Sequence, residues 1–183
     1  LRWGARSAVG IEPNRVARAH AERQGIPVAG ASLEAAALAC DSLDVITAFD
    51  VIEHLESPRH TLVEAARVLR PGGWLIGSTP NGACIRRWGT AWRAMSQDYE
   101  HLTYPDSASL ARCCEWVGFQ PVWWTYAGMP LRLAGYQGAS GRLARWIQEP
   151  GVAVRNAWRR ALVRLGPANA GHELRFAYRL TER

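Results

Sequence analysis

Residues capable of acid–base or ligand chemistry gather in two short stretches of the sequence. Asp50, Glu53 and His54 belong to one Asp-Val-Ile-Glu-His segment, and His101 belongs to a later Glu-His-Leu segment. Carboxylates accept hydrogen bonds from hydroxyl groups, and histidine gains or loses a proton near neutral pH. These residue types suit either proton transfer or the binding of a divalent metal by oxygen and nitrogen ligands.

Val45 to Phe49, the run directly before Asp50, predicts a strand. The run is short and apolar without strict alternation, which is typical of a strand buried on both faces of a parallel sheet. Ligands bind beyond the carboxyl ends of the strands in open α/β sheets. Asp50, Glu53 and His54 are therefore placed for chemistry.

A helix and a second strand are expected to follow. Ser57 suits the N-cap and Pro58 the first helical position. The apolar residues of this segment recur at the spacing of one buried helical face, namely Leu62, Ala65, Ala66 and Leu69. Arg-Pro-Gly-Gly at 70–73 predicts the end of the helix and a tight turn into a strand at 74–78. Residues 43–81 thus predict a βαβ unit.

Glu12 occupies an equivalent place after an earlier predicted strand at 8–11. Asn14 predicts the N-cap of a helix that ends at Gly25. This helix has Val16, Ala19 and His20 on one face. A further short strand is expected at 26–29. A carboxylate at a strand end can accept two hydrogen bonds from a ribose diol. The alternative is that Glu12 is only a solvated residue of a turn.

Three segments resemble the class I S-adenosylmethionine-dependent methyltransferases, and the quinone-pathway O-methyltransferases in particular. They are Val-Gly-Ile-Glu-Pro at 9–13, Leu-Asp-Val-Ile-Thr-Ala-Phe-Asp-Val-Ile-Glu-His-Leu at 43–55, and Leu-Arg-Pro-Gly-Gly at 69–73. Their order and spacing are similar to the second, fourth and fifth strands of that family, over about residues 1–119. The resemblance implies a Rossmann-like three-layer α/β sandwich, with a mostly parallel sheet and an antiparallel last strand.

The resemblance also implies S-adenosyl-L-methionine as the cofactor. Glu12 would hold the ribose hydroxyls, Ser32 and Leu33 would flank the adenine, and Asp50 would lie near the methionine end. The residues assigned to the cofactor are Glu12, Pro13, Ser32, Leu33, Phe49, Asp50 and Val51.

The family's first strand and its glycine-rich loop have no counterpart in the sequence, because both should precede Leu1. Glycines allow the backbone to approach a ligand closely, and that loop approaches the methionine part of the cofactor. We therefore expect an amino-terminally truncated fragment. We also expect the 183-residue chain to bind S-adenosylhomocysteine more weakly than micromolar.

Residues 80–102 are expected to form a wall or lid over a small-molecule acceptor. Apolar residues recur there at roughly helical spacing, namely Ile85, Trp88, Trp92 and Met95. Trp88 and Trp92 either enclose the acceptor or serve only in packing. The residues predicted to contact the acceptor are Asn81, Trp88, Trp92 and His101.

The expected reaction is methyl transfer to a small-molecule acceptor at oxygen. Displacement at a sulfonium is in-line, so the protein must align the two reactants and remove a proton from a hydroxyl acceptor. His101 is the first candidate base, because its loop should face the acceptor. His54 is the second candidate base. Alternatively, His54 is a residue at the start of a helix that only makes local hydrogen bonds.

We expect no metal in this reaction, but one alternative includes a metal. Asp50, Glu53, His54 and His101 would offer oxygen and nitrogen ligands to a divalent ion. Some related methyltransferases, among them quinone-pathway and small-RNA enzymes, use a similar cluster of carboxylates and histidines. The acid-x-x-acid-His pattern is too short to distinguish these alternatives.

The carboxy-terminal part is predicted to complete a single domain over residues 1–183. Asp106 or Ser107 predicts the cap of a helix that ends at Gly118. The predicted buried face of this helix consists of Leu110, Cys113, Cys114 and Val117, which makes both cysteines core residues. Strands are expected at 119–126 and, antiparallel, at 173–180.

A basic helical insert is predicted at 127–170. Its segment 142–165 is amphipathic, and it either packs on the domain or contacts an anionic membrane. The net charge is +6, and all 22 basic residues are arginine. With no fold of known nucleic-acid type and no basic–aromatic strand platform, we expect no nucleic-acid partner.

Other features bound the class of protein. The sequence shows no secretory signal and no apolar run near the roughly 18 residues that span a membrane, so we expect a cytoplasmic protein. The four cysteines have no CxxC spacing, which argues against a zinc site or a disulfide framework.

Two other functions fit parts of the pattern. A degenerate methyltransferase fold could serve as a non-catalytic binding or scaffold module. The absence of the glycine-rich loop would favour this alternative. A nicotinamide-binding Rossmann protein would explain Glu12 but not the segment from Asp50 to Gly73.

Overall fold

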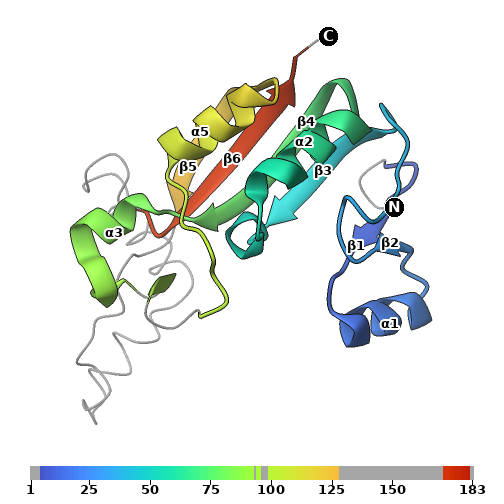
Figure 1. The fold of residues 1–183 in the computed structure, drawn as a ribbon, viewed down its shortest axis with the longest axis horizontal. Helices are drawn as coiled ribbons and strands as arrows, with labels where there is room; N and C mark the ends of the chain where they lie inside the picture. The colour runs from blue at the N-terminus through green and yellow to red at the C-terminus, as the bar shows by residue number, and fades with distance from the viewer. Residues whose placement is uncertain (1–4, 93, 96–98, 128–170, 182–183) are drawn as a thin grey trace, which may run out of the picture.

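The computed structural model describes residues 5–92, 94–95, 99–127 and 171–181 (Figure 1). Apart from Ala127, the predicted basic insert lies outside the described residues, and so does its amphipathic segment 142–165. The elements are β1 (Gly10–Ile11), α1 (Arg15–Arg23), β2 (Val28–Gly30), β3 (Leu43–Phe49), η1 (Ile52–His54), α2 (Pro58–Val68), β4 (Leu69–Pro80), α3 (Ala83–Trp88), η2 (Gly89–Ala91), α5 (Ser107–Trp116), β5 (Phe119–Ala127) and β6 (Glu173–Leu180).

The strands form two sheets. β1 and β2 pair in parallel, and a four-stranded sheet has the order β3-β4-β6-β5. β3 runs parallel to β4, whereas β6 is antiparallel to both β4 and β5. The α/β class and the antiparallel last strand are therefore confirmed.

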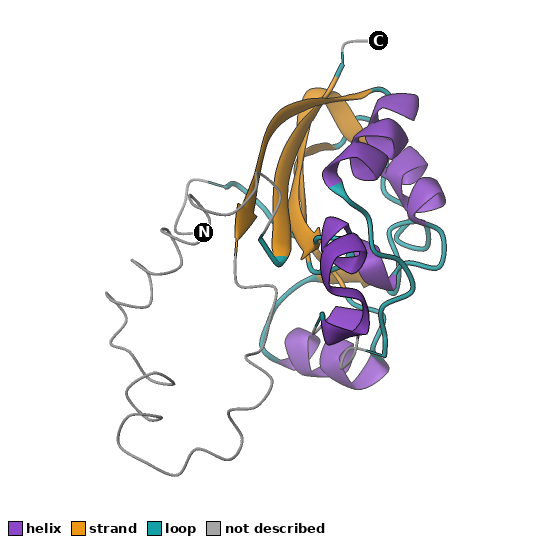
Figure 2. Cartoon of the chain, turned by 90° about the vertical axis from the view of Figure 1, so that its left-hand side faces the viewer, coloured by secondary structure: helices purple, strands orange, loops and turns teal. Residues whose placement is uncertain are grey.

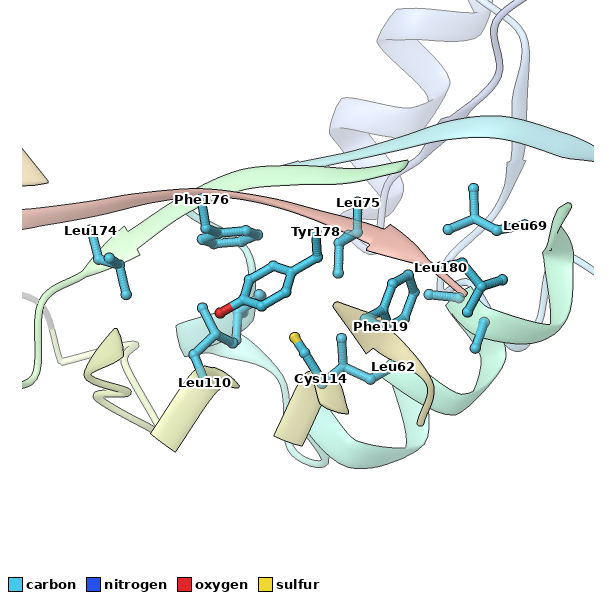
Figure 3. Close-up of a cluster of buried hydrophobic side chains, with 13 residues drawn as sticks. Leu62, Leu69, Leu75, Leu110, Cys114, Phe119, Leu174, Phe176, Tyr178 and Leu180 are labelled. Atoms are coloured by element: carbon cyan, nitrogen blue, oxygen red, sulfur yellow. The ribbon is translucent and has the colours of Figure 1, made fainter. Parts of the chain in front are cut away.

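A hydrophobic core joins this sheet to two helices. α2 and α5 pack on the same face of the sheet, where Leu62 and Cys114 meet Phe176 and Tyr178 of β6 (Figures 2 and 3). All four side chains are at most 3% exposed. This packing holds the ends of the strands in place.

Among the described helices, none is long and apolar enough to cross a membrane.

Local signals explain most of the element boundaries. Asn14 caps α1 by accepting from the main-chain N–H groups of Val16 and Ala17. Asp106 and Ser109 form a reciprocal capping box at the start of α5. Gly118 follows that helix with a φ of 95°, a conformation that suits glycine.

The strand after α2 begins earlier than expected. Leu69 directly follows the helix and pairs with Leu43, and the regular pairing resumes at Trp74 opposite Val45. Arg-Pro-Gly-Gly forms the irregularity between these two pairs, with Gly72 at a φ of 76°. Pro58 does begin α2, but Ser57 makes no side-chain capping bond.

The prediction that residues 45–49 are buried on both faces is wrong. Val45 is 46% exposed and Phe49 is 59% exposed. The reason is that Ile46 and Ala48 alternate with these residues and pack against the core, so that the described residues cover one face of β3 and leave the other open. No residue of α1 is buried, and Val16, on the face that it shares with Ala19 and His20, is 77% exposed.

Two further predictions about helices need correction. Cys114 is buried as expected, but Cys113 is exposed, because only Leu110 and Cys114 of α5 are buried against the core. The helical stripe from Ile85 to Met95 is broken, because α3 ends at Trp88 and Gly89 adopts a φ of 49° before the short turn η2.

Candidate active site

A cavity of about 280 Å³ opens where three strand ends meet. Among the described residues, its lining comprises Asp50, Glu53, Pro80, His101, His172 and Glu173. Because β6 is antiparallel, its first residue Glu173 pairs with Pro80, the last residue of β4. Asp50 directly follows β3, so the topology brings the predicted polar edge and the start of the last strand together.

Asp50 is held in an uncommon backbone conformation. Its φ is 52°, in the left-handed region that non-glycine residues seldom adopt. Its main-chain N–H donates to the carbonyl of Ser78 at 2.9 Å, and the Ser78 hydroxyl donates to Asp50 Oδ1 at 2.9 Å. These two bonds direct an exposed carboxylate to the edge of the cavity.

Glu53 is a fully buried carboxyl group on η1. Its main-chain carbonyl accepts from the N–H groups of Leu102 and Thr103 at 2.8 and 3.1 Å, which fastens the loop of His101 to η1. Neither side-chain oxygen of Glu53 has a hydrogen-bond partner among the described residues. Burial raises the pKa of this carboxyl, and the neighbouring Asp50 carboxylate adds to the rise.

Two imidazoles lie beside Glu53. His54 Nδ1 is 3.1 Å from the carbonyl oxygen of Glu100. Since a carbonyl only accepts, Nδ1 of His54 bears a proton and donates to it, which leaves Nε2 for another partner. Ligand atoms of Glu53, His54 and His101 all lie within 4.8 Å of one another, whereas Asp50 does not belong to this group.

The residues predicted to contact the acceptor have different environments. Asn81 and Trp92 are fully buried, and neither they nor Trp88 lines the cavity. Asn81 donates from Nδ2 to the carbonyl of Gly171 at 2.8 Å, and its main-chain N–H donates to the carbonyl of His172. Of the four residues, His101 is the one that lines the cavity directly.

The residues assigned to the cofactor are mostly accessible. Glu12 Oε1 accepts from the N–H of Asn14 at 2.8 Å, and Ser32 Oγ accepts from the N–H of Ala35 at 3.1 Å. Pro13, Phe49, Asp50 and Val51 are exposed, and Leu33 packs against the edge of the core. Their roles toward a cofactor stay predictions.

His172 and Glu173 were absent from the sequence-based site. Neither belongs to a motif, yet Glu173 begins the strand predicted at 173–180 and His172 directly precedes it. An antiparallel strand begins at the edge where its parallel neighbours end. The predicted direction of that strand was therefore the signal that could have found them.

A family model described as a methyltransferase domain matches residues 1–123. The chain belongs to this family. The recognition of a class I S-adenosylmethionine-dependent methyltransferase is thereby confirmed.

Relatives in sequence and in structure agree with this membership. A ubiquinone biosynthesis O-methyltransferase of Klebsiella pneumoniae is 37% identical over 87 residues, 46% of this chain and 34% of that protein. A probable S-adenosylmethionine-dependent methyltransferase of Mycolicibacterium smegmatis is 37% identical over 118 residues, 63% of this chain and 44% of that protein. The chain thus matches less than half the length of either relative.

The solved structure of an S-adenosylmethionine-dependent methyltransferase from Mesorhizobium loti shows the same fold. It superimposes with a TM-score of 0.63 at 16% identity, covering 97% of this chain and 84% of that one. The Rossmann-like architecture expected from the sequence is therefore confirmed.

Proposed function

We propose that the chain transfers a methyl group from S-adenosyl-L-methionine to an oxygen of a small-molecule acceptor. The observation that supports this most directly is the cavity at the strand ends, where His101 lies with Asp50 and Glu53. The matched part of the Klebsiella pneumoniae O-methyltransferase favours oxygen as the methylated atom. The bond from sulfur to methyl breaks as the bond from methyl to oxygen forms, and S-adenosylhomocysteine leaves.

The donor would lie along the carboxyl ends of β1, β2 and β3. In this proposal the Glu12 carboxylate accepts from the ribose hydroxyls, and Ser32 and Leu33 flank the adenine. Phe49, Asp50 and Val51 face the methionine end, which is consistent with their exposure. The bond from Asn14 N–H to Glu12 Oε1 fixes the carboxylate for this role.

His101 would take the proton that the acceptor hydroxyl loses. Its ring lines the cavity, and its buried Nδ1 has no hydrogen-bond partner among the described residues. A histidine base suits a hydroxyl acceptor near neutral pH. His54, whose Nδ1 is bound to Glu100, is the second candidate through Nε2.

The same groups fit a divalent metal. The Glu53 carboxylate and the two imidazoles offer one oxygen and two nitrogen ligands, and the unpartnered buried oxygens of Glu53 are the observation that favours this alternative. When bound there, a metal supplies positive charge that favours the ionised form of an acceptor hydroxyl. Asp50 would act outside this set.

A non-catalytic module is not favoured, because acid–base residues line a formed cavity and the matched relatives are named as methyltransferases. The test is S-adenosylhomocysteine formation by the purified chain at millimolar S-adenosyl-L-methionine, with catechol as the probe acceptor. We expect methylated catechol in amounts equal to the S-adenosylhomocysteine formed. Donor binding with no turnover of catechol or other hydroxyl probes would contradict the proposal.

A further inference from the structure

Glu173 lines the cavity at the first position of β6, and Arg175 fixes its carboxylate. Arg175 Nε donates to Glu173 Oε1 at 2.9 Å, and Arg175 Nη2 donates to Glu173 Oε2 at 3.2 Å. The side chain of Glu173 remains 27% exposed. Because the contact is bidentate, it fixes the orientation of the carboxylate as well as its position.

The pairing of β6 places Glu173 and Arg175 on one face of the sheet. Residues two apart on a strand point to the same side, and Leu174 between them points into the core that α2 and α5 cover (Figure 3). Glu173 and Arg175 therefore lie on the opposite face. Arg175 pairs with Ser78, whose hydroxyl donates to Asp50. The carboxylates of Asp50 and Glu173 thus lie on either side of β4, and each is held by its own donor.

The strand order assigns these two carboxylates to different reactants. In the proposed function the donor lies along the carboxyl ends of β1, β2 and β3, with Asp50 at its methionine end. β6 lies beyond β4, on the side away from β3. Glu173 is therefore on the acceptor side of the cavity, where the proposed function also places His101.

The carboxylate of Glu173 can accept more hydrogen bonds than the two from Arg175. An ionised carboxylate only accepts, and its two oxygens offer about four lone pairs. Arg175 uses one lone pair on each oxygen. A further contact to this group therefore requires a donor on the bound molecule, which a hydroxyl supplies and an ether or carbonyl oxygen does not.

We propose that Glu173 accepts a hydrogen bond from a second hydroxyl of the methyl acceptor, and that Arg175 is the positioning residue that holds the carboxylate for this contact. The inference rests on the proposed methyl transfer. It defines the substrate class as small molecules with at least two hydroxyl groups. One hydroxyl gives its proton to His101 and receives the methyl group, while the other stays intact and donates to Glu173.

Binding is tested without turnover by comparing catechol with phenol, which lacks the second hydroxyl. Carbon-13 NMR of the 183-residue chain detects the side-chain carboxyl carbons, and Glu173→Gln assigns the signal of Glu173. We expect this signal to move during titration with catechol and to move much less with phenol. Equal movement with both compounds, or none with catechol up to its solubility limit, would overturn the contact.

Kinetics tests whether Glu173 determines specificity. The ratio of kcat/KM for catechol to kcat/KM for phenol should fall by about 10- to 100-fold in Glu173→Leu, the usual effect of losing a hydrogen bond to a charged group. The value for phenol should change less. Glu173→Gln, whose amide oxygen still accepts, should retain part of the preference. An unchanged ratio in Glu173→Leu would contradict the role.

Arg175→Leu tests the positioning role. The ratio should fall in part, because the carboxylate remains but is no longer fixed. Arg179→Leu is the matched control, since Arg179 lies on the same face of β6 and donates to the carbonyl of Gly72. Equal ratios for these two variants would overturn the positioning role.

Two further outcomes keep the test decisive. If Glu173→Leu does not fold, Glu173→Gln and Arg175→Leu decide the matter by the same ratio. Movement of the Glu173 carboxyl signal with catechol, without any methyl transfer, would retain the contact and contradict the proposed function instead.

Discussion

The imidazole rings of His54 and His101 meet edge to face, with their centroids 4.8 Å apart. They belong to segments that are far apart in sequence and are joined by the bonds from Leu102 and Thr103 to the Glu53 carbonyl. His54 is fixed by the Glu100 carbonyl, whereas His101 faces the cavity. The pair therefore has one anchored ring and one ring that lines the cavity.

His101→Gln is expected to lower kcat by about 100- to 10,000-fold, the usual contribution of a general base. The measurement is S-adenosylhomocysteine formation with catechol across pH 6–9. His60→Gln, at an exposed histidine of α2, is the matched control and should be neutral. Equal rates for the two variants would remove His101 from the reaction.

Glu12→Gln is expected to weaken binding of S-adenosylhomocysteine by about 10- to 100-fold, because hydrogen bonds to a charged acceptor are worth roughly 1.5–3 kcal/mol. An NMR titration into the millimolar range measures this even if the 183-residue chain binds weakly. Glu22→Gln, at an exposed position of α1, supplies the control. A Glu12→Gln affinity equal to that of the control would show that the ribose is held elsewhere.

Glu53→Gln should stabilise the chain in metal-free buffer at high pH. Since burial raises the pKa of Glu53 in the folded state, its contribution to stability is full below the unfolded pKa and is lost as pH rises through the folded pKa. Glutamine has no such loss. The difference in Tm between variant and wild type should therefore grow from pH 4 to pH 8.

Glu56→Gln, at an exposed position just after η1, should show no such trend. Added Mn²⁺ tests the metal alternative in the same assay. A metal held by Glu53, His54 and His101 would raise the wild-type Tm and leave Glu53→Gln unaffected. A Tm difference that stays flat with pH would contradict the burial of this carboxyl.

Gly82→Ala should destabilise the fold by about 1–3 kcal/mol, the usual result of overpacking. A Cβ at this position would overlap the main-chain carbonyl of Tyr104, which cannot move aside as a side chain can. Urea unfolding measures the loss. Gly10→Ala, where a Cβ would meet nothing nearer than 3.6 Å, should be nearly neutral, and equal midpoints for the two variants would refute the account.

Much of the fold was predictable because its signals are local. The caps Asn14 and Asp106, and the run 43–81, depend on residues close in sequence. The family followed from three such segments. The exposure of β3 was not predictable in this way, because burial of a strand depends on which neighbours it has.

The site was predicted in part. Asp50, Glu53 and His101 were identified by residue type and spacing, and they do line one cavity. The position of Trp92 was harder, since it contacts His172 across 80 residues of chain. The hydrogen-bond acceptor of a buried indole N–H cannot be predicted from the residues next to it in the sequence.

The two residues just before β6 are hydrogen-bonded to the middle of the chain across 80 to 90 positions, through Trp92 with His172 and Asn81 with Gly171. Bringing such distant segments together costs loop entropy before any contact repays it, which slows folding. The part of the cavity wall next to β6 would then form late in folding. A nascent chain would contain Asp50, Glu53 and His101 well before the cavity that they line is complete.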